Sequence, residues 1–199
     1  MDTIEERRVE VPDAPRIDGL RFRCYTGEHD IPGMAEVIRA ANAANGESEY
    51  VSDDYLRSQV VNYSHYPPQE ARLIALVDGR IVACSEYEHA DTTAGRREYR
   101  SFGHVHPRWR RRGIGTAMSA WNEGRLLDIA ARQQHPGGAA LTTWIEEADV
   151  GATVLVEARG YERTRIGFHM VRPDLDAIDV PPLPNGLEVR RVARDHLPR

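Results

Sequence analysis

Residues 102–117 read Phe-Gly-His-Val-His-Pro-Arg-Trp-Arg-Arg-Arg-Gly-Ile-Gly-Thr-Ala. Pro107 has no backbone N–H to donate to a β-ladder, so a strand that enters this stretch ends there. Beyond an arginine-rich loop, Ile114, Met118 and Trp121 recur at helical spacing. The stretch therefore predicts a strand, a short basic loop and a helix, and the rest of the fold is organised around it.

The loop opens onto the N-terminus of the predicted helix, where unpaired N–H groups and the helix dipole attract anions. Gly113 and Gly115 keep bulky side chains away from these N–H groups, and arginines occupy positions 110–112. A solvated basic turn or a contact to nucleic-acid phosphate would also use arginines, but neither needs the paired glycines. The sequence therefore predicts a site for a small phosphate-containing ligand.

Two other phosphate-binding motifs do not fit this loop. The Walker loop requires a lysine, and all 26 basic residues of the chain are arginine. The dinucleotide fingerprint requires a third glycine where this chain has Met118, and no strand-loop-helix unit with an acidic residue about 20 positions on is evident.

The loop resembles the signature of the GNAT superfamily of acyl-CoA-dependent N-acyltransferases. Residues 105–107 match its Val-x-Pro, and residues 110–116 match the Gln/Arg-x-x-Gly-x-Gly/Ala that follows. The resemblance implies an α/β fold of GNAT type, with a mixed, mostly antiparallel central sheet, a β-α-β crossover and helices on both faces. It also implies acetyl-CoA as a co-substrate.

The same resemblance implies which residues hold the co-substrate. Residues 103–105 would bond the pantetheine arm as a neighbouring strand does, and the amides of residues 111–116 would hold the pyrophosphate. Alignment of Gly160 and Tyr161 with the family's Gly-Phe places Asp149 where an asparagine is usual. The cofactor-binding candidates are Gly103, His104, Val105, Arg110, Arg111, Arg112, Gly113, Ile114, Gly115, Thr116 and Asp149.

Composition limits the classes of protein that the chain can belong to. Its 199 residues suffice for one domain with a core of its own. The net charge of -5 argues against a general nucleic-acid binder. Neither a signal peptide nor a membrane span is evident, so the cytoplasm is the expected compartment. The only cysteines, Cys24 and Cys84, are expected to be buried reduced thiols.

The chain before the loop is predicted to alternate strands and helices. Ser52 is a suitable N-cap for a helix, and Asp78-Gly79 supplies the positive φ angles of a type I′ hairpin turn. A second hairpin is expected to turn at residues 92–95. The predicted strands are 20–25, 71–77, 80–89 and 98–106, and the predicted helices are 31–44 and the segment that begins at Ser52.

The chain after the loop predicts the parallel part of the sheet. A helix at 115–133 ends before Pro136-Gly137-Gly138, and residues 140–145 are apolar and β-branched, as in a buried parallel strand. A helix at 149–159 is expected to end at Gly160 with a left-handed cap. Residues 161–171 are predicted to form a closing strand.

Composition also predicts four segments along the chain. Residues 1–18 are expected to be an extended N-terminal tail, residues 19–172 the GNAT-like domain, and residues 173–185 a proline-rich linker. Residues 186–196 resemble residues 19–29, so residues 186–199 are either the start of a second GNAT-like repeat or a C-terminal extension. The first interpretation makes the chain the N-terminal half of a tandem-GNAT protein.

The side chains expected to carry the chemistry depart from the family's pattern. Val156 stands where many members have a proton-donating tyrosine, and Trp144 and Tyr99 stand where some have a glutamate base. Glu98 is the predicted catalytic base, turned inward by a β-bulge next to the site. Alternative bases are Glu86, Glu88 and His89, and Tyr161 is an alternative acid. His104 and His106 share a face of the strand, but no third ligand accompanies them and no metal site is predicted.

Within the resemblance, three functions remain open. The first is an acetyl-CoA-dependent N-acetyltransferase in which a primary amine of a small molecule or peptide attacks the thioester directly. The second is a weak or inactive scaffold domain that binds CoA or supports a second, active domain. The third is a nucleic-acid-binding module, which the net charge disfavours. Expected partners are the amine acceptor and either a second GNAT domain or a second copy of the chain, with neither nucleic acid nor a membrane.

Overall fold

The computed structural model describes residues 8–47, 50–62, 65–168, 170–172, 174, 176 and 178–193, with residues 61 and 62 described by their backbone alone. The chain divides into two compact units, Met1–Glu162 and Arg163–Arg199. This boundary precedes the one predicted after Arg172. Parts of the predicted tail, linker and repeat lie outside the described residues, namely 1–7, 173, 175, 177 and 194–199.

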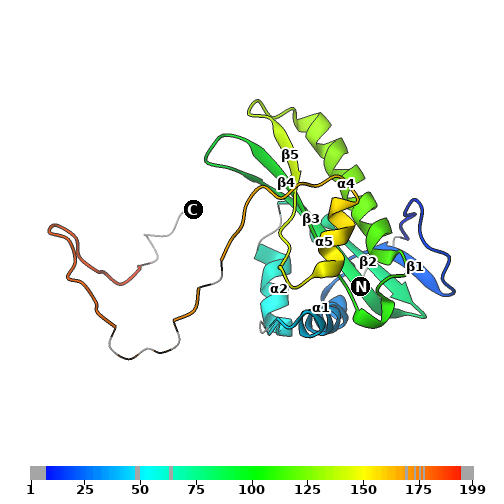
Figure 1. Ribbon diagram of the computed structural model, residues 1–199, viewed down its shortest axis with the longest axis horizontal. Helices are drawn as coiled ribbons and strands as arrows, with labels where there is room; N and C mark the ends of the chain where they lie inside the picture. Colours follow the sequence, from blue (N-terminus) through cyan, green and yellow to red (C-terminus); the bar gives the residue numbers. More distant parts are fainter. Residues whose placement is uncertain are drawn as a thin grey trace. The chain divides into compact units, whose positions relative to one another are not determined.

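The first unit is built on a five-stranded sheet in the order β1-β2-β3-β4-β5. Neighbouring strands from β1 to β4 are antiparallel, and β4 and β5 are parallel. The helix α4 forms the crossover between the parallel strands, as predicted. The strands are β1 (Leu20–Cys24), β2 (Arg72–Val77), β3 (Arg80–Asp91), β4 (Arg97–Val105) and β5 (Ala139–Thr142) (Figure 1).

Helices cover both faces of the sheet. The helices are α1 (Ile31–Asn45), α2 (Asp53–Asn62), α3 (Pro68–Ala71), α4 (Ile114–Gln133) and α5 (Val150–Glu157), with short 3-10 helices η1 (Glu28–Asp30) and η2 (Pro107–Trp109). On one face α1 and α2 pack against Ile74 and Cys84. On the opposite face α4 packs against Leu73 and Ala83. The predicted two-sided α/β fold is confirmed.

The local signals act as predicted. The Ser52 hydroxyl accepts a hydrogen bond from the Tyr55 amide, so it caps α2. Asp78 and Gly79 both have positive φ, 48° and 79°, as the type I′ turn requires. Both cysteines are buried, and neither forms a disulfide. In the part of the chain that the structure describes, no helix is both long and apolar enough to cross a lipid bilayer.

The predicted closing strand is wrong for the described residues between 161 and 172, which contain no strand. β5 ends at Thr142, and the sheet ends at β5. The apolar alternation that suggested a strand is present, but Ile166, Phe168 and Met170 are 68%, 83% and 89% exposed. A period-2 pattern identifies side chains that could share a face but not a neighbouring strand to pair with.

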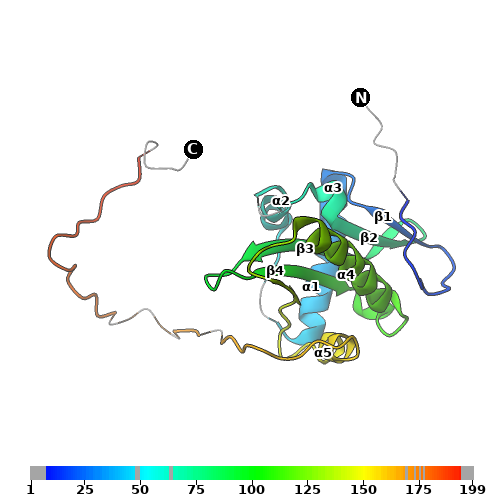
Figure 2. The ribbon, with the colours of Figure 1, turned by 90° about the horizontal axis from the view of Figure 1, so that it is seen from above.

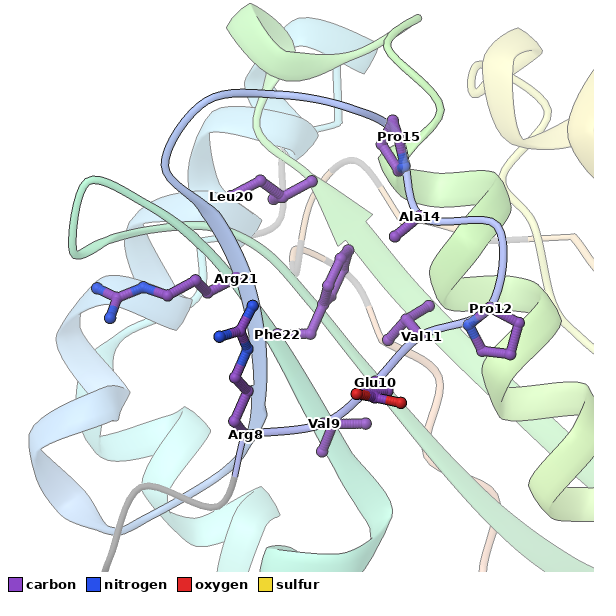
Figure 3. A pocket seen from close by; sticks show the side chains of 10 residues that line it. All are labelled: Arg8, Val9, Glu10, Val11, Pro12, Ala14, Pro15, Leu20, Arg21 and Phe22. Atoms are coloured by element: carbon purple, nitrogen blue, oxygen red, sulfur yellow. The ribbon is translucent and has the colours of Figure 1, made fainter.

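Residues 8–18, predicted as part of a loosely ordered tail, pack against the sheet. The Val9 amide donates to the Phe22 carbonyl, and Val11 is buried in the same apolar cluster as Phe22 and Met118. Figure 3 shows Val11 and Phe22 inside the loop of residues 8–22, whereas Arg21 points away from it. The segment is therefore part of the core on the α4 side of the sheet.

Candidate functional site

The loop between β4 and α4 presents a continuous run of unbonded backbone amides. The first helical hydrogen bond of α4 runs from the Ala117 amide to the Gly113 carbonyl. Among the described residues, the amides of residues 111–116 have no acceptor. Arg111 and Gly113 have left-handed backbone conformations, with φ of 61° and 84°. Left-handed residues at such a turn direct successive N–H groups into one concavity, which is a nest for an anion.

The two glycines of this loop keep the concavity open for different reasons. A Cβ on Gly113 would lie 3.3 Å from Pro15 Cβ, and its positive φ already disfavours a side chain. A Cβ on Gly115 would make ordinary contacts, 3.5 Å from Val105 Cγ2 and 3.6 Å from Leu155 Cδ1. Protein packing therefore does not account for Gly115, but a ligand against the amides would.

The three loop arginines divide into one that points inward and two that lie at the surface. The Arg110 guanidinium donates to the Val105 and Ala41 carbonyls and, at 2.9 Å, to Asn45 Oδ1. Arg111 and Arg112 are exposed, and the Arg112 guanidinium lies 4.6 Å from the centre of the Trp109 ring. Arg110 thus joins the loop to α1, and the two exposed arginines remain available to an anion.

The strands β4 and β5 separate next to this loop. Their pairing begins at Arg97↔Ala139 and ends at Arg100↔Thr142. The Thr143 hydroxyl donates to the Ser101 carbonyl, which shows that this carbonyl faces the β5 side. Because backbone groups of alternate residues in a strand point to the same edge, those of Gly103 and Val105 also face the side that β5 has left. The fork exposes peptide groups that an extended ligand could pair with.

Asn45 links the elements around the fork. Its Nδ2 donates to Glu47 Oε1 and to Asp149 Oδ2, both at 3.0 Å, and its Oδ1 accepts from Arg110. Asp149 is also the N-cap of α5, because its Oδ1 accepts from the Ala152 amide. α5 accordingly lies beside the C-terminal end of α1 (Figure 2). The resemblance assigned Asp149 to the ligand site, whereas nothing in the sequence indicated this network.

His104 lies in the fork, between Gly103 and Val105 on β4. Its strand partner is Cys84, which belongs to the cluster under α1, so the His104 ring is on the α1 side of the sheet. Burial, aided by the charge of Arg110, lowers the pKa of the imidazole, and the carboxylates of Glu47 and Asp149 oppose the shift. The imidazole is therefore neutral at pH 7.

The predicted base Glu98 lies at the other end of β4. Its carboxylate bonds to the Arg100 guanidinium at 2.8 Å. The register of β3 and β4 is continuous from Ala83↔Val105 to Asp91↔Arg97, so the bulge expected beside Glu98 is absent. Six residue steps separate Glu98 from His104, which is roughly 20 Å at about 3.3 Å per residue.

The other candidate bases and the candidate acid also have partners. Glu86 pairs with Arg72 at 2.5 Å, Glu88 faces Arg100 at 3.6 Å, and His89 Nδ1 bonds to the Tyr66 hydroxyl. Burial and then the charge of Glu123 raise the pKa of Tyr161 to about 12, so its hydroxyl stays protonated. Within the described residues no three side chains of His, Cys, Asp or Glu gather in a way that could hold a metal ion.

The chain is similar to known acetyltransferases in sequence. It is 28% identical over 185 residues to a mycothiol acetyltransferase of Salinispora arenicola, a match that covers 90% of this chain and 52% of that protein. The chain therefore spans about half the length of this curated relative. No family profile matches the chain.

The fold is similar to that of solved acetyltransferases. A GCN5-related N-acetyltransferase from Sphaerobacter thermophilus superposes with a TM-score of 0.56 at 22% identity, over 77% of this chain and 45% of that chain. A protein of Clostridium acetobutylicum described as a predicted acetyltransferase, solved with acetyl-CoA, gives a TM-score of 0.52 at 15% identity, over 76% of this chain and 96% of that one. At these identities the structures establish the fold alone.

Proposed function

We propose that this chain, whose fold and phosphate-loop motif are those of the GNAT superfamily, is an acetyl-CoA-dependent N-acetyltransferase that acts on a primary amine. The observation that carries the proposal is the run of unbonded amides at residues 111–116. The first N–H groups of a helix have no acceptor within the helix, and a diphosphate supplies several acceptor oxygens in the space that Gly113 and Gly115 leave open.

The fork between β4 and β5 is proposed to hold the rest of the co-substrate. The peptide groups of Gly103 and Val105 would pair with the amides of the pantetheine arm, as a neighbouring strand would. A backbone N–H at this edge would also stabilise the oxyanion that develops when an amine attacks the thioester carbonyl. A solved structure with a similar fold was determined with acetyl-CoA, which supports acetyl-CoA as the co-substrate.

The acceptor is proposed to be a small-molecule or peptide amine that enters from the α1 side of the fork. The name of the Salinispora relative favours a small molecule. Attack is direct: the amine nitrogen bonds to the thioester carbonyl carbon, the carbon–sulfur bond breaks, and the nitrogen loses a proton while the sulfur gains one.

The test is release of free thiol from acetyl-CoA by the full chain, measured with a panel of small-molecule and peptide amines. We expect release that depends on one class of amine, together with saturable binding of CoA seen by calorimetry. Absence of both thiol release and CoA binding would contradict the proposal.

Two observations support a second candidate, a scaffold domain that binds CoA and assists a second, active GNAT-like domain. Val156 stands where the resemblance implies a proton-donating tyrosine, and residues 186–196 resemble residues 19–29. The similarity of these two segments supports a tandem arrangement with that second domain. Thermal stabilisation by CoA without turnover of any amine would favour the scaffold over the enzyme.

A further inference from the structure

His104 differs from the other ionisable histidine, carboxylate and tyrosine side chains of β3 and β4 in its hydrogen bonding. Within the described residues, it alone among the histidines, carboxylates and tyrosines of β3 and β4 has no hydrogen-bond or ion-pair partner. The others and their partners are Glu86 with Arg72, Tyr87 with the Glu70 carbonyl, Glu88 and Glu98 with Arg100, His89 with Tyr66, Asp91 with Arg97, and Tyr99 with Gln133.

The His104 ring is nevertheless not sealed in the core. Neither ring nitrogen of His104 is among the fully buried side-chain atoms without a partner in the described residues, so both nitrogens keep some exposure to solvent. The residue as a whole is half-buried. An unbonded imidazole with accessible nitrogens therefore faces the α1 side of the fork.

The position of His104 fits a proton acceptor for the reaction. Its neighbours Gly103 and Val105 present the peptide groups at the open edge of β4, and the ring leaves the same strand between them. A nucleophile bound on the α1 side of β4 would approach the edge past this ring. A neutral imidazole within hydrogen-bond reach of the attacking nitrogen is the group that general base catalysis requires.

The charged groups around the His104 ring also fit a proton acceptor. The acidic groups that face His104 are Glu47 and Asp149, both bonded to the Asn45 amide, and the basic group is Arg110. The opposite strand contributes the Cys84 thiol, whose pKa burial raises to about 12, so that it stays uncharged. The two carboxylates stabilise the imidazolium that forms when the ring takes a proton, without a bond that would occupy the ring beforehand.

We propose that His104 is the general base of the acetyl transfer, an inference that rests on the function proposed above. A ring nitrogen of His104 accepts the proton that the acceptor nitrogen loses as the new carbon–nitrogen bond forms. The imidazolium then donates this proton to the sulfur as the carbon–sulfur bond breaks, so that the ring ends the cycle neutral. Asn45 is a positioning residue that holds the two carboxylates beside the ring.

The experiment compares His104→Gln with His29→Gln in the full chain, using the amine that the wild type acetylates. His29 is a control because its side chain is 70% exposed and lies in η1. We expect His104→Gln to lower kcat by about 10²-fold or more with an unchanged affinity for CoA. At saturating amine, the same variant should also lose the fall of kcat at low pH that protonation of the ring causes in the wild type. His29→Gln should keep both.

A kcat of His104→Gln within about threefold of the wild type would overturn the assignment and leave the acetyltransferase function standing. A wild type that binds CoA but releases no thiol with any amine would instead contradict the proposed function, and the base with it. If His104→Gln does not fold, His104→Asn takes its place, and a kcat of that variant within about threefold of the wild type overturns the proposal in the same way.

Discussion

The loop between β4 and α4 and the fork between β4 and β5 are adjacent in the fold, but the groups they offer to a ligand differ in origin. The loop offers backbone amides, and its shape depends on where glycine and proline stand along a short segment. The network beside the fork depends on side chains from the end of α1, the segment after it, the loop and the N-cap of α5, joined through Asn45. A site made of backbone is encoded locally, whereas a site made of side chains is encoded across the whole chain.

The largest expected effect tests the backbone half of this comparison. Gly113→Val should weaken CoA binding by about 10²-fold or more, because a β-branched residue resists the left-handed conformation that orients the amides. The matched control is Gly95→Val in the β3–β4 turn, where φ is 78° and a Cβ meets nothing within 4 Å. Both variants bear similar backbone strain.

Calorimetric titration with CoA separates the two glycine variants. Gly95→Val should bind as the wild type does and lose only about 1–2 kcal/mol of stability. Equal loss of CoA affinity in both variants would show that backbone strain at any turn weakens binding. The conformation of this particular loop would then not control it.

The second prediction tests the side-chain network around Asn45. Asn45→Asp should destabilise the first unit by about 2 kcal/mol at pH 7, because it replaces two N–H donors with a third carboxylate beside Glu47 and Asp149. The loss should shrink as the pH falls toward about 4, where an aspartic acid side chain takes up its proton and can donate again. Urea unfolding at several pH values measures both effects.

Asn45→Ala is the control for charge. It removes the two bonds that Asn45 donates and also the one that it accepts from Arg110, without adding a carboxylate, so the stability it loses should not return on acidification. If the free energy of unfolding changes with pH in the same way for both variants, the carboxylates of Glu47 and Asp149 do not lie next to residue 45 in solution.

The smallest expected effect concerns the residue that sequence reasoning chose as the base. Glu98→Gln should leave kcat within about threefold of the wild type, because Glu98 is bonded to Arg100 at the far end of β4. Loss of that charge-assisted bond should cost about 1–2 kcal/mol of stability. A fall in kcat as large as that expected for His104→Gln would return the base to Glu98.

The sequence predicts the loop, which is made of backbone groups, better than the side-chain network around Asn45. The strand end at Pro107, the glycines of the loop, the Asp78-Gly79 turn and the Ser52 cap are local signals, and the structure confirms the elements they mark. The network of Asn45 joins residues 65 and 104 positions apart. No periodicity or spacing carries information over such separations, so the network could not be predicted.

His104 illustrates an intermediate case. Its place on the key strand was predicted, and it was assigned to the co-substrate because of the resemblance. Its lack of a partner could not be predicted, because that property depends on what the neighbouring strands and α5 place around the ring. The closing strand failed for a related reason, since residues 161–171 carry the right alternation and the described part of the chain provides no strand beside them.

The central claim is that the amides of residues 111–116 bind the diphosphate of acetyl-CoA. The most direct measurement is a nitrogen-15 NMR titration of the labelled chain with CoA, following each backbone amide. We predict that the largest shifts fall on residues 111–116 and that they are absent in Gly113→Val. Saturable CoA binding that leaves these amide resonances unmoved would contradict the account.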